Sequence, residues 1–360
     1  MVATEDCADH RERDAKRYTC HEVPPCAQRV RPAGQLSFGT LALVRRLSDS
    51  TMAHLLLLAT VFVWGATFVV VKDALRDASP LMFNLLRMSL AFCALVIVNW
   101  REFKQISKRG LFAGGAVGLL LATGYQFQTT GLARTTPAKS AFITGLVVVF
   151  VPLLTMVRAL RPAGVKGPRW TAGVGAMLAF GGLLLLTTPA GTAWGRLFES
   201  IGLGDWLTLG CAVAFAGHLL ALGRFSPGLP TGQLATVQIG VAAVVMALTV
   251  RVGEQPFVRF TPRLWVALAV TSLLATAAAF TIQSWAQKHL PPTHTAVILS
   301  LEPVFAWLTA MVFLGERLGM RSLAGAGLIF AGIALTELFP GPQVAEALVE
   351  TPSPNPVMPV

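Results

Sequence analysis

A glutamate followed directly by a proline interrupts a long apolar stretch near the carboxyl end of the chain. Glu302 and Pro303 lie within residues 293–314, where nearly every neighbour is apolar. A carboxylate can bind a cation or carry a proton, and proline has no N–H, so the carbonyl of Leu299 loses its helical partner. Such polar notches are tolerated where they line water or a substrate path. The structural alternative is an ion pair, or a protonated carboxyl group bonded to a neighbouring helix.

Other polar side chains also lie inside apolar stretches. Gln283 and Gln287 are four residues apart, so they share one helix face, where they can line a pore or bridge helices. His218 can relay a proton or make a packing hydrogen bond. The remaining residues that we expect along a substrate or proton pathway are Gln126, Gln128 and Trp64.

Four charged residues have simpler interpretations. Glu316 follows a glycine and is expected to be a solvated charge at a helix end. Asp205 opens an apolar stretch and favours a helix N-terminus. Lys72 is expected to extend to the lipid headgroups, and Arg87 needs an acceptor or a route to the interface.

Catalytic and metal motifs are missing from the sequence. It holds no GxSG, no HExxH, no second intramembrane aspartate to partner Asp205, and no phosphate-binding Gly-Lys-Ser/Thr loop. The amino-terminal cysteines and histidines make a metal site conceivable, but their spacing matches no zinc pattern well. We therefore predict neither an enzyme nor a protein with a metal or cofactor.

Long helices that cross a membrane must position these polar residues. The 360-residue chain is 54% hydrophobic and 13% charged, whereas soluble domains carry roughly 25% charged residues. Apolar runs long enough to cross about 30 Å of hydrocarbon predict an all-α integral membrane protein with ten spans. The predicted spans are residues 54–72, 81–99, 111–131, 138–158, 170–187, 205–223, 233–250, 263–282, 293–314 and 320–338.

The net charge of +11 reflects membrane topology rather than nucleic-acid binding. Many basic residues lie in short loops beside spans, as Arg101, Lys104, Lys108 and Arg109 do, and no basic helix or aromatic platform accompanies them. Basic residues in the first half favour both termini in the cytoplasm. The bias is reversed in the second half.

An internal repeat divides the chain into two halves. Shifting the sequence by about 155 residues aligns Gln128 with Gln283 and Pro137 with Pro292, inside a gap-free run of matching apolar positions. Each half holds five predicted spans, so the second half enters the membrane in the opposite sense. We expect residues 53–188 and 203–339 to form two inverted five-helix repeats.

The two ends of the chain differ from these repeats. Residues 1–52 form a polar extension that we expect to be disordered, and residues 340–360 form a proline-rich disordered tail. Met52, directly before the first apolar run, is a candidate natural start of translation, which the intact mass of the native protein would test.

Six segments together resemble the EamA family of the drug/metabolite transporter superfamily, in its ten-span form. In the first half they are WGATFVVVK (64–72), NLLRMSL (84–90) and TGLARTTPAKSAFITGLVVVFVPLL (130–154). In the second half they are GDWLTLGCAVAFAGHLLALGR (204–224), TIQSWAQKHLPPTHTAVILSLEPVFA (281–306) and FLGERL (313–318). The sequence departs from many relatives at Val147 and Val148, which occupy the positions equivalent to Glu302 and Pro303.

The resemblance implies ten helices, in the two inverted repeats, around a central cavity. It also implies a secondary transporter of small metabolites, often amino acids or drug-like polar and cationic compounds, usually working as an exporter in the plasma membrane. Partners would be the small-molecule substrate, membrane lipid and, in some relatives, a coupled proton; a homodimer is possible. The competing hypotheses are a receptor or scaffold that transports nothing and, less favoured, a membrane enzyme.

Overall fold

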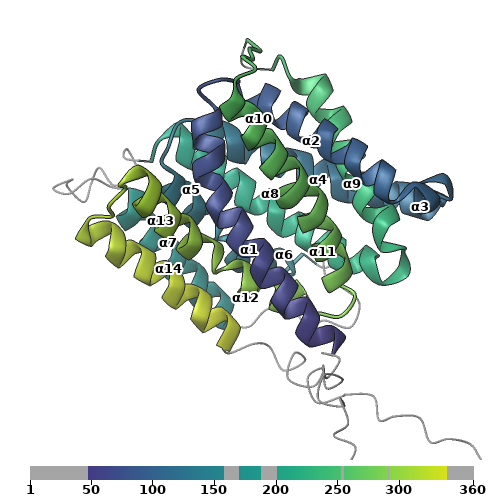
Figure 1. The fold of residues 1–360 in the computed structure, drawn as a ribbon. Helices are drawn as coiled ribbons and strands as arrows, with labels where there is room; N and C mark the ends of the chain where they lie inside the picture. Colours follow the sequence, from purple (N-terminus) through teal and green to yellow (C-terminus); the bar gives the residue numbers. More distant parts are fainter. Residues whose placement is uncertain (1–47, 158–169, 188–200, 253–254, 291, 339–360) are drawn as a thin grey trace, which may run out of the picture. The chain divides into compact units, whose positions relative to one another are not determined.

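The computed structural model describes residues 48–157, 170–187, 201–252, 255–290 and 292–338. The predicted terminal segments lie almost entirely outside these ranges. The described chain is helical, with an isolated two-residue bridge between Ala78 and Val258 (Figure 1). The helices are α1 (Asp49–Ala74), α2 (Pro80–Val98), α3 (Trp100–Lys104), α4 (Lys108–Leu132), α5 (Pro137–Thr144), α6 (Val147–Leu154), α7 (Trp170–Thr187), α8 (Leu203–Phe225), α9 (Thr231–Thr249), α10 (Pro262–Ala269), α11 (Ala279–Ala286), α12 (Pro292–Leu299), α13 (Glu302–Leu314) and α14 (Met320–Leu338), with the 3₁₀ turn η5 (Ser226–Gly228) and the π-helical segment η6 (Val270–Ala278).

Length and composition make this an all-helical membrane protein. Within the described residues, seven helices are long and apolar enough to cross a membrane, and the three other predicted spans contain shorter apolar helices. Large apolar side chains such as Ile97, Phe112 and Leu248 are exposed on the outside of the helices. Exposed apolar side chains are stable when lipid rather than water surrounds them.

Helix starts follow the local sequence. Ser48, Ser107, Thr136 and Thr261 each precede a helix, and each side chain accepts a hydrogen bond from a backbone N–H in the first turn. These bonds satisfy donors that have no partner inside the helix. Side-chain chemistry therefore sets where α1, α4, α5 and α10 begin.

Two stretches that the sequence predicts as spans are each divided into two helices. α5 ends at Thr144 and α6 begins at Val147, while α12 ends at Leu299 and α13 begins at Glu302. The second interruption is the disruption expected from Pro303. The first corrects the prediction of an uninterrupted helix over 138–158. The predicted span 263–282 also differs, because it extends to Ala286 and contains η6.

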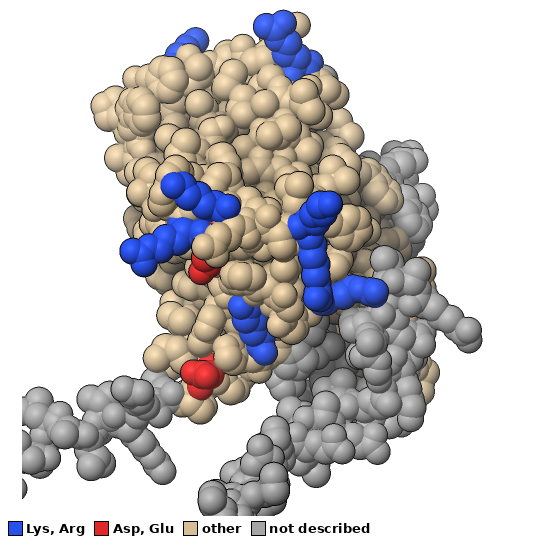
Figure 2. Space-filling view, turned by 90° about the vertical axis from the view of Figure 1, so that its right-hand side faces the viewer, with Lys and Arg blue, Asp and Glu red and all other residues tan. Residues whose placement is uncertain are grey.

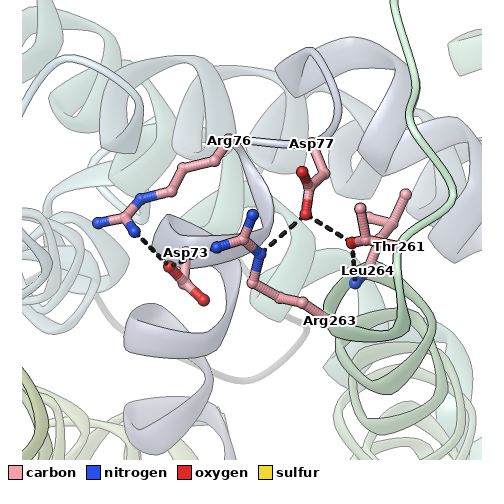
Figure 3. Close-up of polar contacts among 6 residues, drawn as sticks. All are labelled: Asp73, Arg76, Asp77, Thr261, Arg263 and Leu264. Carbon is pink, nitrogen blue, oxygen red and sulfur yellow. Dashed lines mark hydrogen bonds and ion pairs between the residues drawn. The ribbon is translucent and has the colours of Figure 1, made fainter.

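A short clasp joins the loop after α1 to the loop before α10. We define it as residues 75–79 together with residues 257–263. The Ser79 amide donates to the Phe257 carbonyl at 3.1 Å, and the Arg259 amide donates to the Asp77 carbonyl at 2.7 Å. The Asp77 carboxylate accepts hydrogen bonds from Thr261 Oγ1 at 2.7 Å and Arg263 Nε at 2.8 Å (Figure 3). The clasp therefore links the first half of the chain to the second.

Acid should loosen the clasp. Hydrogen bonds from Arg263 and then Thr261 lower the pKa of Asp77 below its ordinary value. A carboxylate with a lowered folded-state pKa stabilises the fold above the unfolded pKa of about 3.9, and this contribution is lost as the pH falls through the folded value. We expect the protection of the Ser79 and Arg259 amides against hydrogen exchange, measured relative to the intrinsic rate at each pH, to fall on acidification below about pH 4. In Asp77→Asn this pH dependence should be lost. A pH profile identical to that of the wild type would show that Asp77 is not the titrating group.

The opposite end of the helices carries basic residues. The Glu102 carboxylate in α3 accepts a hydrogen bond from the backbone N–H of Gln233 at 2.9 Å, and Gln233 Nε2 donates to the Gln105 carbonyl at 3.0 Å. The connection after α2 therefore meets the start of α9. Burial lowers the pKa of Lys288, which follows α11, and Glu102 opposes that shift. Figure 2 shows the side on which α3 lies in Figure 1, where blue side chains outnumber red ones.

Candidate functional site

A cavity of about 70 Å³ lies between helices from both halves of the chain. Five of the predicted pathway residues line it, which are Trp64, Gln128, His218, Gln283 and Glu302. Gln126, Gln287 and Pro303 are not among the lining residues. Residues far apart in the sequence thus share one internal space that is large enough for more than one water molecule.

The two interrupted helices meet at this cavity. Gly145, at the interruption between α5 and α6, lines the cavity together with Glu302, the first residue of α13. A Cβ atom placed on Gly145 would lie 2.8 Å from Pro303 Cγ. A side chain at Gly145 would therefore collide with the proline ring, and this close approach explains why glycine suits the position.

Helix α1 packs tightly against the same interruption. A Cβ atom on Gly65 would lie 2.9 Å from the Glu302 carbonyl oxygen and 2.6 Å from Phe305 Cβ. Next to Gly65, Trp64 faces the cavity, and its Nε1–H donates to the Ala275 carbonyl at 2.8 Å. The missing side chain of Gly65 thus lets α1 approach the start of α13 closely.

Arg87 is a cavity residue that the sequence did not place there. The residue is 3% exposed. Its Nε donates to Thr276 Oγ1 at 2.7 Å, and its Nη2 donates to Tyr125 Oη at 3.0 Å and to the Ala275 carbonyl at 3.2 Å. The Ala275 carbonyl and Thr276 belong to η6, and π-helical turns free backbone carbonyls for such bonds. The only sequence signal was that an arginine within a span needs an acceptor.

Aromatic rings form much of the remaining cavity wall. Tyr125 makes edge-to-face contacts with Phe215 at 5.4 Å and Phe280 at 6.0 Å between ring centroids. The Arg87 guanidinium lies 4.4 Å from the centroid of the Tyr125 ring. The wall therefore combines apolar ring faces with a few fixed polar groups, as small-molecule sites usually do.

His218 connects the cavity to a buried polar chain. Its Nε2 lies 3.0 Å from Gln238 Oε1, and Gln238 Nε2 donates to Ser284 Oγ at 3.1 Å. Because the Gln238 oxygen can only accept, Nε2 carries the proton in this arrangement and Nδ1 is the lone-pair nitrogen. This series of hydrogen bonds joins α8, α9 and α11, so His218 has a packing role in addition to facing the cavity.

The side-chain amides of Gln126 and Gln128, both on α4, have different surroundings. Gln126 Nε2 donates to Thr249 Oγ1 at 2.8 Å, and its Oε1 accepts from Asn84 Nδ2 at 3.1 Å, so Gln126 bridges α2, α4 and α9. Gln128 lines the cavity. Two positions along a helix turn a side chain by about 200°, which separates these roles.

Gln283 and Gln287 are also separated by the fold. Gln283 lines the cavity, and its buried Oε1 has no hydrogen-bond partner among the described residues. Gln287 lies one turn further, and its Nε2 reaches the Leu219 carbonyl at 3.5 Å. An unpaired oxygen beside the cavity is available to a ligand.

We expect Gln283→Met to weaken substrate flux by roughly three- to tenfold, as loss of one hydrogen bond would, and Gln287→Met to leave flux near wild type. Initial rates at equal membrane levels would measure both. Equal losses in the two variants would show that the amides act through packing alone.

Asp205 and Lys72, two charged residues outside the cavity, each have partners within the fold. Asp205 accepts an ion pair from Lys139 at 2.8 Å and a hydrogen bond from the Gly202 amide at 3.0 Å, so it does favour its helix start. Lys72 Nζ donates to three carbonyls after and at the end of α4, those of Leu132, Ala133 and Thr135, instead of extending to headgroups. Across the described residues, no cluster of three or more His, Cys, Asp or Glu side chains could hold a metal ion.

The apolar helices that enclose the internal cavity are those of a multi-pass membrane protein. The chain belongs to the EamA-like transporter family, whose profile matches residues 51–188 and 202–338. The family likeness predicted from the motifs is therefore confirmed, and the protein is a transporter rather than an enzyme.

Similar proteins agree with this assignment. An uncharacterized transporter of Archaeoglobus fulgidus is 31% identical over 288 residues, which cover 79% of this chain and 86% of the relative. The uncharacterized inner membrane transporter YedA of Escherichia coli K12 is 24% identical, with 82% of this chain and 95% of the relative covered. The uncharacterized transporter YwfM of Bacillus subtilis is 25% identical, with 81% and 96% covered.

A solved structure shares the fold. It has a TM-score of 0.57 and 18% sequence identity, and the match covers 83% of this chain and 99% of the other. At this identity the likeness concerns the fold alone.

Proposed function

We propose that the protein is a secondary transporter that moves a small polar metabolite across the cell membrane by alternating access. The observation that carries this proposal is the cavity between the two halves, where the interruptions of two helices meet beside Glu302. Interrupted helices at the interface between repeats are a common site for substrate in secondary transporters.

The ten predicted spans would form two inverted repeats, residues 53–188 and 203–339. The interruptions support this arrangement, because Gly145 and Leu146 are shifted by 155 residues from Ser300 and Leu301. Equivalent interruptions in two related halves let each half adopt the conformation of the other. The side of the membrane to which the cavity opens would then alternate.

Charge favours one orientation. The end with α3 carries Arg101, Lys104, Lys108 and Arg109, whereas basic residues at the clasp end, such as Arg263, are interleaved with acidic ones. By the positive-inside rule the α3 end would face the cytoplasm, with both termini there as well.

Export of amino acids or of drug-like polar compounds is the activity that we favour. Membrane lipid would surround the helices, Glu302 could couple a proton, and a homodimer is compatible with the fold. We expect no cofactor and no nucleic-acid partner.

The extracellular metabolites of cells that express the protein test this proposal. Cells with the wild type should enrich at least one small polar compound in the medium relative to cells with an empty vector. Saturable flux of that compound into liposomes with the purified protein should follow. Absence of flux for every compound in both directions would favour a receptor or scaffold instead.

A further inference from the structure

Four basic side chains lie close together in the sequence at the end of the molecule that carries α3. These residues, which we call the basic patch, are Arg101, Lys104, Lys108 and Arg109. All four are exposed, and none makes an ion pair or a hydrogen bond within the described ranges. The ion pairs that the described residues do form lie at the clasp or at the starts of α5 and α8. The basic patch is therefore a group of uncompensated positive charges on the side that Figure 2 shows.

The one acidic residue of this connection, Glu102, does not neutralise the basic patch. Its carboxylate accepts the hydrogen bond from the backbone N–H of Gln233 at 2.9 Å. It also lies within electrostatic reach of Lys288, which follows α11. Four cations thus stand against one anion, and that anion already interacts with other groups.

Hydrogen bonds hold the backbone that carries the basic patch against α9. Asn99 Nδ2 donates to Thr236 Oγ1 at 3.2 Å, and Gln233 Nε2 donates to the Gln105 carbonyl at 3.0 Å. Ser107 caps the first turn of α4. The four cations therefore extend from a fixed backbone, which lowers the entropic cost of binding a ligand between them.

Exposed apolar side chains adjoin the basic patch. Five of them are each more than half exposed, namely Ile97, Val98, Trp100, Leu111 and Phe112. On α4, Lys108 lies three and four residues before Leu111 and Phe112, so its charge and their apolar surface share one helix face. Lys104 Nζ lies 4.3 Å from the ring centroid of Trp100, a residue type that favours the membrane–water interface. Positive charge beside exposed apolar surface matches the two parts of a phospholipid, its headgroup and its acyl chains.

We propose that the basic patch binds the headgroup of an anionic phospholipid, whose acyl chains lie against the exposed apolar side chains beside it. Clusters of four or more Lys and Arg residues next to a membrane span are suited to such headgroups. In a zwitterionic phospholipid the positive group of the headgroup offsets its phosphate, so that lipid gains less from the four cations. The inference is independent of the proposed transport function, because it requires only that these helices lie in a membrane.

Two lipids with the same acyl chains but different headgroups test the inference. Palmitoyl-oleoyl phosphatidylglycerol and palmitoyl-oleoyl phosphatidylcholine are titrated into the full chain in a non-ionic detergent. Native mass spectrometry counts the bound lipids, and thermal shift gives the lipid concentration at half-saturation. Phosphatidylglycerol should bind about tenfold or more tightly, and this preference should shrink at about 1 M salt, where charges are screened within about 3 Å.

A fourfold glutamine variant of the basic patch should bind the two lipids alike. Its matched control removes the same number of positive charges from exposed arginines at the clasp end, and should keep the wild-type preference. The control combines Arg134→Gln, Arg251→Gln, Arg259→Gln and Arg317→Gln. If the fourfold variant of the basic patch fails to fold, the double variant Lys108→Gln/Arg109→Gln should still lose at least about threefold of the preference.

Equal binding of the two lipids by the wild type would overturn the inference. So would a wild-type preference in the variants of the basic patch, or an equal loss in the clasp-end control, which would indicate an effect of net charge alone. Inorganic phosphate at the same concentration should leave the melting temperature unchanged. A shift as large as that with phosphatidylglycerol would show a phosphate site rather than a lipid site. The metabolite experiment tests transport separately, whichever of these results is found.

Discussion

Glu302→Gln should lower substrate flux by at least about tenfold while the protein remains folded. The change keeps the size of the side chain but removes the single acidic group that the structure places on the cavity wall. An interaction between charged groups in such a site contributes roughly 1.5–3 kcal/mol, which corresponds to about a ten- to hundredfold change in binding. Initial flux into proteoliposomes, with the melting temperature measured on the same preparation, gives both quantities.

The matched control is Asp49→Asn, which makes the same carboxylate-to-amide change at an exposed helix start. It should leave flux and melting temperature close to wild type. Normal flux with normal pH dependence in Glu302→Gln would show that the carboxylate has a structural role only.

Gly145→Ala should destabilise the protein by about 1–3 kcal/mol and reduce flux, because an added methyl group overpacks the contact between the interrupted helices. The new Cβ would lie 2.8 Å from Pro303 Cγ and 3.3 Å from the Phe142 carbonyl oxygen. The proline ring cannot swing away as a flexible side chain would, so the backbone of one helix must shift. Thermal unfolding and flux measured on the same preparations would show the effect.

Gly115→Ala is the control for this prediction. Gly115 is a half-buried helical glycine with open space where its Cβ would be. Its replacement should be neutral or slightly stabilising, since alanine favours helices. If both alanine variants behave alike, the contact between Gly145 and Pro303 does not constrain the site.

The sequence predicted one of the two helix interruptions for a clear physical reason. Proline removes a backbone donor, so an interruption near Pro303 followed from a single residue. Val147 and Val148, at the equivalent positions, gave no such signal. There the weak helix preference of the following valines combines with the close contact between Gly145 and Pro303, which exists only in the folded structure.

The rotation of each helix about its axis was the other quantity that the sequence could not supply. Apolar residues occupy every face of the predicted helices, so no amphipathic pattern showed which polar residue faces inward. Gln128 and Gln283 reach the cavity, while Gln126 and Gln287 bond to neighbouring helices. Arg87 became a site residue only once its acceptors on η6 were located.

The central claim is that a single cavity between two repeats opens in turn to each side of the membrane. A cysteine in place of Gln128, in a chain whose five native cysteines are replaced, places a reporter on the cavity wall. Arg76→Cys, at an exposed position near the clasp, reports one side only. Membrane-impermeant maleimides should label the cavity cysteine from both sides and the Arg76→Cys control from one. Labelling of the cavity cysteine from a single side would contradict alternating access.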